Sequence, residues 1–140
     1  MTTVTDLPHR ITQKITVDRE TGCWLWTGYT LKGYGRVSWP GGPRYAHRVV
    51  FELLVGPIPE GFDADHLCRR PACCNPQHIE PVSHRENVLR GIDAMTTCRN
   101  GDHPWVAENI MTQANGYRTC RACRLASYER RNASRLAVAA

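Results

Sequence analysis

The 140-residue chain is long enough for one compact domain, or for a core domain with a small appendage. Its first residues lack the apolar stretch of a signal peptide, and no window approaches 18 apolar residues, so we expect a soluble, cytoplasmic protein without a membrane segment. Its seven cysteines are an odd number, and no leader accompanies them, which argues against a secreted disulfide framework and favours metal binding.

The positive charge is concentrated near one end of the sequence. The chain has 18 basic residues and a net charge of +5. Residues 1–117 carry 12 basic and 12 acidic side chains, whereas residues 118–140 carry six Arg against Glu129 alone. Because Arg makes bidentate contacts with phosphate, this basic end predicts a polyanionic partner. A solvated, charged helix is the alternative.

The first half of the sequence predicts short strands followed by a helix. Residues 7–17 are expected to form a short helix. Residues 23–27 and 34–39 are rich in aromatic and β-branched side chains and are bounded by glycines, which predicts two strands. A Pro-Gly-Gly-Pro turn follows at 40–43. Residues 45–55 repeat apolar side chains with a helical period and precede a glycine, which predicts a helix.

The middle of the sequence predicts a strand, a loop, a strand and a helix in turn. Residues 62–66 are expected to form a strand. Residues 67–77 show neither helical nor strand periodicity, so this loop needs stabilising contacts beyond its own backbone. Residues 79–82 are expected to return as a short strand. A Ser-x-x-Glu capping box at 83–86 then begins a helix that we expect to end near Gly91.

The last third of the sequence has a different character. Residues 96–124 are rich in turn-forming residues and lack an apolar period, and a helix is expected from Arg121 onward. We therefore predict an α+β core over residues 1–95, followed by a zinc-binding unit with a basic C-terminal helix over residues 96–140.

Two groups of Cys and His have the spacing of zinc ligands. Structural zinc takes four thiolate or imidazole ligands from the protein. Three ligands of the first group lie close together in or next to the loop, and the fourth is the one upstream cysteine: Cys23, Cys68, Cys73 and His78. Cys74 is the alternative to Cys73, because two adjacent cysteines do not readily bind one ion. The second combines a C-x2-C pair with a distant Cys and His: Cys98, His103, Cys120 and Cys123. We expect two structural Zn²⁺ ions, which would supply folding free energy.

Three polar residues outside these groups could carry chemistry. Asp65 and His66 directly precede the first zinc loop, and Asn87 lies on the helix after it. Phosphodiester hydrolysis needs a base beside an oxygen-ligated divalent ion. His66 is the candidate general base, while Asp65 and Asn87 offer oxygen ligands suited to Mg²⁺ or Mn²⁺. Taken singly, each could be structural, and His47, on an apolar helix, is expected only to pack or to form a hydrogen bond.

Together these residues resemble the ββα-metal nucleases. The run that carries the resemblance is Asp65-His66-Leu67-Cys68-x4-Cys73-x-Asn75-Pro76-x-His78-x8-Asn87. It is most similar to His-Cys box homing endonucleases and to small HNH endonucleases of phage genomes, and it covers about residues 22–91. The resemblance implies an α+β fold: a small zinc-stabilised ββα-metal core of short antiparallel strands, followed by a zinc finger-like unit and a helix.

The resemblance also implies roles for individual residues. His66 would be the general base, with Asp65 and Asn87 as ligands of the catalytic metal. At His78 these nucleases usually have an Asn that orients the base, and since His78 is assigned to zinc here, a backbone carbonyl of the zinc loop is expected to take over that role. One arginine is expected to clamp the scissile phosphate, in this order of preference: Arg44, Arg48 and Arg36.

We therefore expect a metal-dependent endonuclease that cuts double-stranded DNA, in the host cytoplasm if a phage encodes it. The sequence leaves a homodimer open. The alternatives are a non-catalytic, zinc-stabilised DNA-binding module and a ribonuclease or toxin nuclease with the same site. The predicted DNA-binding residues lie on the strands of the core and on one face of the last helix: Arg36, Arg44, Arg121, Arg124, Arg131 and Arg135.

Overall fold

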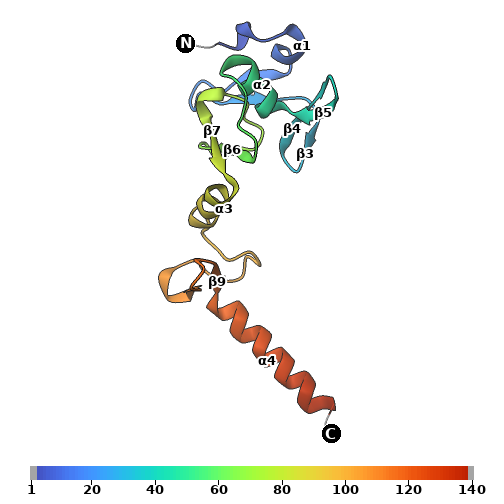
Figure 1. The fold of residues 1–140 in the computed structure, drawn as a ribbon. Helices are drawn as coiled ribbons and strands as arrows, with labels where there is room; N and C mark the ends of the chain where they lie inside the picture. The colour runs from blue at the N-terminus through green and yellow to red at the C-terminus, as the bar shows by residue number, and fades with distance from the viewer. Residues whose placement is uncertain (1–2, 139–140) are drawn as a thin grey trace. The chain divides into compact units, whose positions relative to one another are not determined.

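The computed structural model describes residues 3–138, with side chains up to residue 134. Its internal contacts divide the chain into unit 1, Met1–Asn87, and unit 2, Val88–Ala140 (Figure 1). Both units combine short antiparallel strands with helices, so the predicted α+β class is confirmed. Among the described helices, none is both long and apolar enough to cross a membrane.

Unit 1 alternates short strands with helices. Its described strands pair in the orders β1-β2, β3-β4-β5 and β6-β7, all antiparallel. In chain order its elements are η1 (Val4–Asp6), α1 (His9–Thr12), β1 (Ile15–Val17), β2 (Trp24–Trp26), β3 (Thr30–Leu31), β4 (Tyr34–Trp39), β5 (Gly42–Tyr45), α2 (Ala46–Leu54), β6 (Phe62–His66), η2 (Pro76–His78), β7 (Ile79–Ser83) and α3 (His84–Asp93), the last of which continues into unit 2.

Most predicted elements of unit 1 are confirmed, and two predictions are wrong. The helix expected over 7–17 ends at Thr12, because the residues of β1 pair with β2, with Ile15 opposite Trp26. The helix expected to end near Gly91 continues to Asp93. A glycine inside a helix costs only about 1 kcal/mol, so it need not end one.

The core of unit 1 lies between α1, α2 and the strands β2 and β4. Ile11, Val49 and Val50 are at most 1% exposed, and the two tryptophans of β2 pack with them. The ring of Trp26 lies directly on Gly35 of β4, where an added Cβ would come within 2.7 Å of the indole Cγ. The glycine is therefore needed for the close approach of strand and ring.

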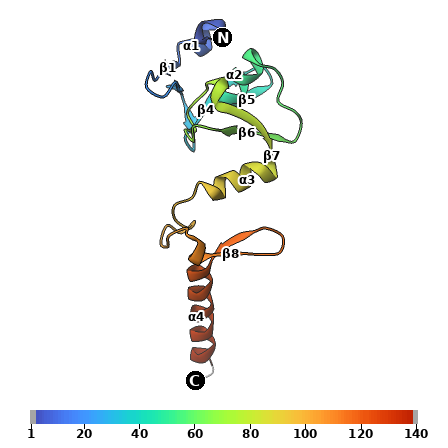
Figure 2. The ribbon, with the colours of Figure 1, turned by 90° about the vertical axis from the view of Figure 1, so that its left-hand side faces the viewer.

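Strands β6 and β7 and helix α3 follow one another directly (Figures 1 and 2). The two strands pair along their whole length, from Phe62 opposite Ser83 to His66 opposite Ile79. Ser83 Oγ accepts a hydrogen bond from the Glu86 amide at 3.2 Å, as the capping box predicts. The result is a ββα arrangement in which α3 starts at the end of the hairpin.

Unit 2 contains a small hairpin and a long helix. Its elements after α3 are η3 (Ala107–Asn109), β8 (Ile110–Thr112), β9 (Arg118–Cys120) and α4 (Arg121–Val138). Strands β8 and β9 pair with Ile110 opposite Cys120. The helix begins at Arg121, as predicted, and runs without interruption (Figure 2).

Candidate functional site

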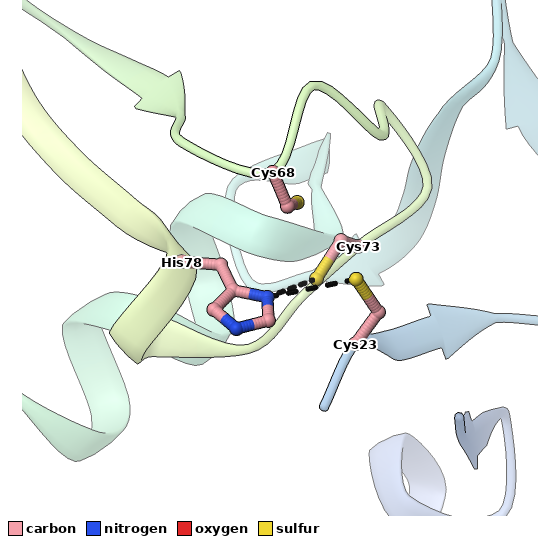
Figure 3. Close-up of side chains that lie close together, drawn as sticks. All are labelled: Cys23, Cys68, Cys73 and His78. Atoms are coloured by element: carbon pink, nitrogen blue, oxygen red, sulfur yellow. Dashed lines mark hydrogen bonds between the residues drawn. The ribbon is translucent and has the colours of Figure 1, made fainter. Parts of the chain in front are cut away.

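The first predicted ligand group comes together in unit 1. The ligand atoms of Cys23, Cys68, Cys73 and His78 all lie within 4.8 Å of one another (Figure 3). The Sγ atoms of Cys23 and Cys73 each lie 3.6 Å from His78 Nδ1. A tetrahedral zinc ion with ordinary Zn–S and Zn–N bonds separates sulfur from nitrogen by about 3.6 Å. The donor set and its spacing therefore fit a zinc ion.

Pairing between β2 and the loop after β6 brings the distant Cys23 to this group. The Trp26 amide donates to the Ala72 carbonyl at 2.9 Å, and the Cys74 amide donates to the Trp24 carbonyl at 2.8 Å. This pairing also decides between the neighbouring cysteines, since Cys73 joins the cluster while Cys74 is buried in the core. Burial raises the pKa of the Cys73 thiol to about 12, and a bound cation would favour the thiolate instead.

The second predicted ligand group comes together in unit 2. The ligand atoms of Cys98, His103, Cys120 and Cys123 lie within 4.8 Å of one another. His103 Nδ1 is 3.7 Å from the sulfur of Cys98 and 3.3 Å from that of Cys123, and the two sulfurs are 3.6 Å apart. These separations are again near those around a tetrahedral zinc ion. Both Cys/His clusters could therefore bind zinc.

Two asparagines support the second cluster, and neither was predicted. Asn100 Nδ2 donates to the sulfur of Cys123 at 3.4 Å, and Asn109 Nδ2 donates to that of Cys120 at 3.3 Å. Such donors stabilise thiolate ligands. Asn109 Oδ1 also accepts from the Ala122 amide at the start of α4, which ties the helix to the cluster. Isolated asparagines carry no spacing signal that could have revealed this.

His66 lies at the end of β6 and is 6% exposed. Its Nε2 is 2.9 Å from the Cys73 carbonyl oxygen. Because a carbonyl only accepts, Nε2 carries the proton, and Nδ1 of the neutral ring keeps its lone pair. A backbone carbonyl of the zinc loop was expected to orient His66, and the Cys73 carbonyl makes such a contact. Burial lowers the pKa of His66, although the Cys73 carbonyl and the Asp65 charge act in the opposite direction, so the ring is neutral at pH 7.

A second histidine, His47 of α2, lies against His66. The two ring centroids are 4.6 Å apart in an edge-to-face arrangement, and the Tyr34 ring lies 5.8 Å from both. His47 is 5% exposed, and its Nδ1 has no hydrogen-bond partner among the described residues. Burial, followed by the effects of His66 and Arg48, lowers the pKa of His47 to about 3. The sequence indicates only a packing or hydrogen-bonding role for His47, since nothing local in the chain points to His66 as its partner.

The two oxygen-bearing candidates lie on adjoining elements. Asp65, on β6, is 5% exposed, and Arg69 Nη1 lies 3.2 Å from its Oδ1. Asn87, on α3, donates from Nδ2 to Oδ2 of Asp63 at 2.9 Å. His84 Nδ1 lies 2.9 Å from the same oxygen. The structure thus connects Asn87 to β6 through Asp63, a residue that the sequence did not single out.

This ββα segment coincides with a known family. Residues 44–89 match the HNH endonuclease family, over a range that includes His66 and Asn87. We call the matched residues, 44–89, the HNH domain. The resemblance inferred from the motif is confirmed, and the domain places this segment in a nuclease family.

The chain is also similar to small phage proteins. It is 39% identical to "Protein 2.8" of Escherichia phage T7 over 85 residues, and this aligned stretch covers 59% of this chain and 57% of the relative. It is 37% identical over 67 residues to "Protein 7.7" of the same phage, 46% of this chain and 51% of the relative. A third relative, the "Uncharacterized gene 5.3 protein" of Enterobacteria phage T3, is 39% identical over 44 residues, 31% of this chain and 44% of the relative.

The chain spans about half the length of the curated relatives it matches. No solved structure matches it.

The arginines of the HNH domain and of the preceding strand differ in their contacts. Arg44 Nη2 forms an ion pair with Glu52 Oε1 at 2.6 Å. Arg36 Nη2 donates to the Pro43 carbonyl at 2.9 Å, and its guanidinium stacks on an aromatic ring of β5. Arg48 contacts the Phe62 carbonyl at 3.4 Å, and its charge helps to lower the pKa of both His47 and Asp63. Arg48 is thus the candidate clamp whose charge acts on the ββα segment.

The remaining arginines predicted to bind DNA lie on α4. Arg121, Arg124 and Arg131 are exposed, as is the ring of Tyr128. Their spacing of three or four residues places Arg124, Tyr128 and Arg131 on one helical face. Arg135 also belongs to α4, but its side chain lies outside the described residues.

Proposed function

We propose that this chain is a metal-dependent endonuclease that hydrolyses phosphodiester bonds in double-stranded DNA. The observation that carries the proposal is the 2.9 Å contact between His66 Nε2 and the Cys73 carbonyl inside an HNH domain. That contact fixes one ring nitrogen as the donor and leaves the other as an unprotonated base. A base that is neutral at pH 7 and held in one orientation is what water activation requires.

The chemistry assigned to His66 is the transfer of one proton. Nδ1 removes a proton from a water molecule as the water oxygen forms its bond to phosphorus. The bond from phosphorus to the leaving oxygen breaks, and that oxygen is protonated by solvent. The Cys73 carbonyl holds the ring through Nε2–H and stabilises the imidazolium while it carries the second proton.

Asp65 and Asn87 would hold the catalytic Mg²⁺ or Mn²⁺ through carboxylate and amide oxygens, which are the donors that such ions prefer. When bound, the ion supplies positive charge to the scissile phosphate and the leaving oxygen. The two Cys/His clusters would hold structural zinc, because four protein ligands leave no open position. The first zinc ion would hold in place the loop whose carbonyl orients His66.

Arginine side chains would bind the DNA backbone. Arg48 would clamp the scissile phosphate, since it is half-buried beside β6 and its charge acts on His47 and Asp63. The exposed arginines of α4 would contact other phosphates of the DNA backbone. Arg44 remains the second candidate for the clamp, because its ion pair with Glu52 would first have to open.

Plasmid cleavage by the purified, zinc-loaded protein tests the proposal. We expect cleavage with Mg²⁺ and none without it. His66→Gln retains an N–H donor for the Cys73 carbonyl but lacks the base, so we expect cleavage to fall by about 10²–10⁴-fold while DNA binding persists. His9→Ala is the matched control, because His9 is exposed, and it should cut at the wild-type rate.

Each result separates the proposal from its alternatives. Mg²⁺-dependent cleavage by His66→Gln at the wild-type rate would contradict the assignment of the base. DNA binding without cleavage under any divalent metal would identify a zinc-stabilised binding module instead. Faster cleavage of RNA than of plasmid would identify a ribonuclease with the same site.

A further inference from the structure

Asp63 is a half-buried residue beside the candidate site, and the proposed mechanism gives it no role. Its Oδ2 accepts hydrogen bonds from two residues of α3, Asn87 Nδ2 and His84 Nδ1, both at 2.9 Å. The Asp63 side chain is 34% exposed, whereas that of His84 is 79% exposed.

The hydrogen bond from Asn87 Nδ2 to Asp63 Oδ2 fixes which end of the Asn87 amide faces Asp63. A carboxylate only accepts hydrogen bonds, so the amide nitrogen must point toward Asp63 and the amide oxygen away from it. The last torsion of an Asn side chain is broad and roughly two-fold, so an unrestrained amide exchanges its two ends readily. Only the oxygen end can bind a hard cation.

The strand geometry places Asp63 on the same side as the other expected metal ligand. Side chains two apart on a strand share a face, and Asp63 and Asp65 are two apart on β6. Asn87, which is hydrogen-bonded to Asp63, therefore lies on the side of β6 that carries Asp65. Supporting hydrogen bonds of this kind commonly fix the orientation of metal ligands.

We propose that Asp63 is a positioning residue, which holds Asn87 so that its amide oxygen is directed to the catalytic metal ion. This inference rests on the proposed function, in which Asn87 is a metal ligand. The proposal gives Asp63 a supporting role and not a ligating one, since its Oδ2 already accepts from both Asn87 and His84. Its role is to exclude the amide orientation that presents nitrogen to the ion.

Mn²⁺ binding by the full, zinc-loaded chain, followed by electron paramagnetic resonance, tests the proposal without using activity. We expect Asp63→Ala to weaken Mn²⁺ binding by about 10–100-fold, as removal of a supporting partner does elsewhere. Asp63→Asn keeps an acceptor oxygen for Asn87 but also brings an N–H donor that permits the reversed amide, so its Mn²⁺ affinity should lie between those of wild type and Asp63→Ala. His84→Ala is the matched control, because it removes the other partner of Asp63, and it should bind Mn²⁺ normally.

A double-variant cycle separates positioning from direct binding. In an Asn87→Ala background, Asp63→Ala should cause no further loss, because no amide is left to orient. Additive losses would make Asp63 a ligand, and an equal loss in Asp63→Asn and Asp63→Ala would make it a source of negative charge; either result overturns the inference. Unchanged zinc content and melting temperature exclude unfolding as the cause.

The same series distinguishes the inference from the proposed function. If Asn87→Ala weakens Mn²⁺ binding but Asp63→Ala does not, Asn87 is a ligand that needs no positioning, and only the inference fails. If Asn87→Ala has no effect on Mn²⁺ binding, Asn87 is not a metal ligand, and the metal site of the proposed function fails with it.

Discussion

The two units have similar Cys/His clusters but very different interiors. In unit 1 the cluster adjoins a hydrophobic core that includes Trp24, Trp26, Val49 and Val50. In unit 2 the described side chains that are buried are those of Cys98 and Cys120, both members of the cluster itself. Unit 1 therefore has apolar burial in addition to its cluster, whereas unit 2 has little besides the cluster.

This difference indicates that a metal ion would have a different task in each unit. Structural zinc contributes an apparent free energy of about 10–16 kcal/mol in peptides that have almost no core. In unit 2 that contribution would decide whether the unit folds. In unit 1 it would mainly order the loop of residues 67–77, whose backbone carbonyl at Cys73 orients His66.

Removal of metal should give the largest effect and test the comparison directly. We expect a zinc chelator to unfold unit 2 completely, while the core of unit 1 keeps part of its structure. Amide hydrogen exchange measures both at once. Protection should be lost throughout β8, β9 and the start of α4, and it should persist around Val49 and Val50 of α2.

Single ligand variants separate the two clusters. Cys120→Ser should leave one zinc ion per chain and unfold unit 2 alone, whereas Cys68→Ser should abolish cleavage while the core of unit 1 stays folded. Cys74→Ser is the matched control: it replaces a core cysteine and should retain both zinc ions. Full exchange protection of unit 2 in zinc-free protein would show that the comparison is wrong.

A smaller effect should be confined to unit 1, where His47 is buried as a neutral ring. Its pKa is about 3 in the folded protein, against about 6.5 when unfolded. Between these values the unfolded chain binds the extra proton, so stability falls as pH falls below about 6.5. The loss from this residue approaches about 1.4 kcal/mol per pH unit.

Urea unfolding of the zinc-saturated protein between pH 7.5 and 5.5 measures this loss. We expect His47→Phe, which keeps an aromatic ring against His66, to lose less stability over this range than the wild type. His9→Ala should follow the wild-type curve, because His9 is exposed. Identical pH dependence in wild type and His47→Phe would show that His47 is not held neutral.

The sequence predicted those parts of the site whose signal is local. Cys68, Cys73 and His78 are five residues apart, and the C-x2-C pair of unit 2 is closer still, so spacing alone revealed most of both clusters. The strand ending at His66 and the capping box at Ser83 were likewise visible from adjacent residues. Cys23 could be added because no other upstream cysteine exists.

Contacts between distant elements could not be predicted. The hydrogen bond from Asn87 to Asp63 joins residues 24 positions apart, on a helix and a strand. The contact between His47 and His66 depends on how α2 packs against β6. The expected helix over 7–17 failed for the same reason, because pairing with β2 decides the conformation of Ile15–Val17. Such outcomes depend on tertiary packing, which overrides local preference.

The units also differ in charge, and this difference leads to the prediction with the smallest effect. The net positive charge of the chain lies within residues 118–140, whereas the proposed chemistry lies in unit 1. Each lost phosphate contact releases one fewer counterion and lowers the slope of log K against log salt by about 0.9. Arg124→Ala combined with Arg131→Ala should therefore reduce the slope by about 1.8 and weaken binding to unrelated DNA sequences alike.

Binding isotherms over a range of salt concentrations, with cleavage measured at saturating protein, test this division of labour. Cleavage by the double variant should persist at saturation, because both arginines belong to unit 2, outside the HNH domain. Arg19→Ala removes an exposed arginine from unit 1 and is the control for loss of charge alone. If the double variant binds DNA as the wild type does at every salt concentration, α4 is a solvated helix. The DNA surface must then lie on the strands of unit 1, around Arg36 and Arg44, and unit 1 would carry both affinity and chemistry.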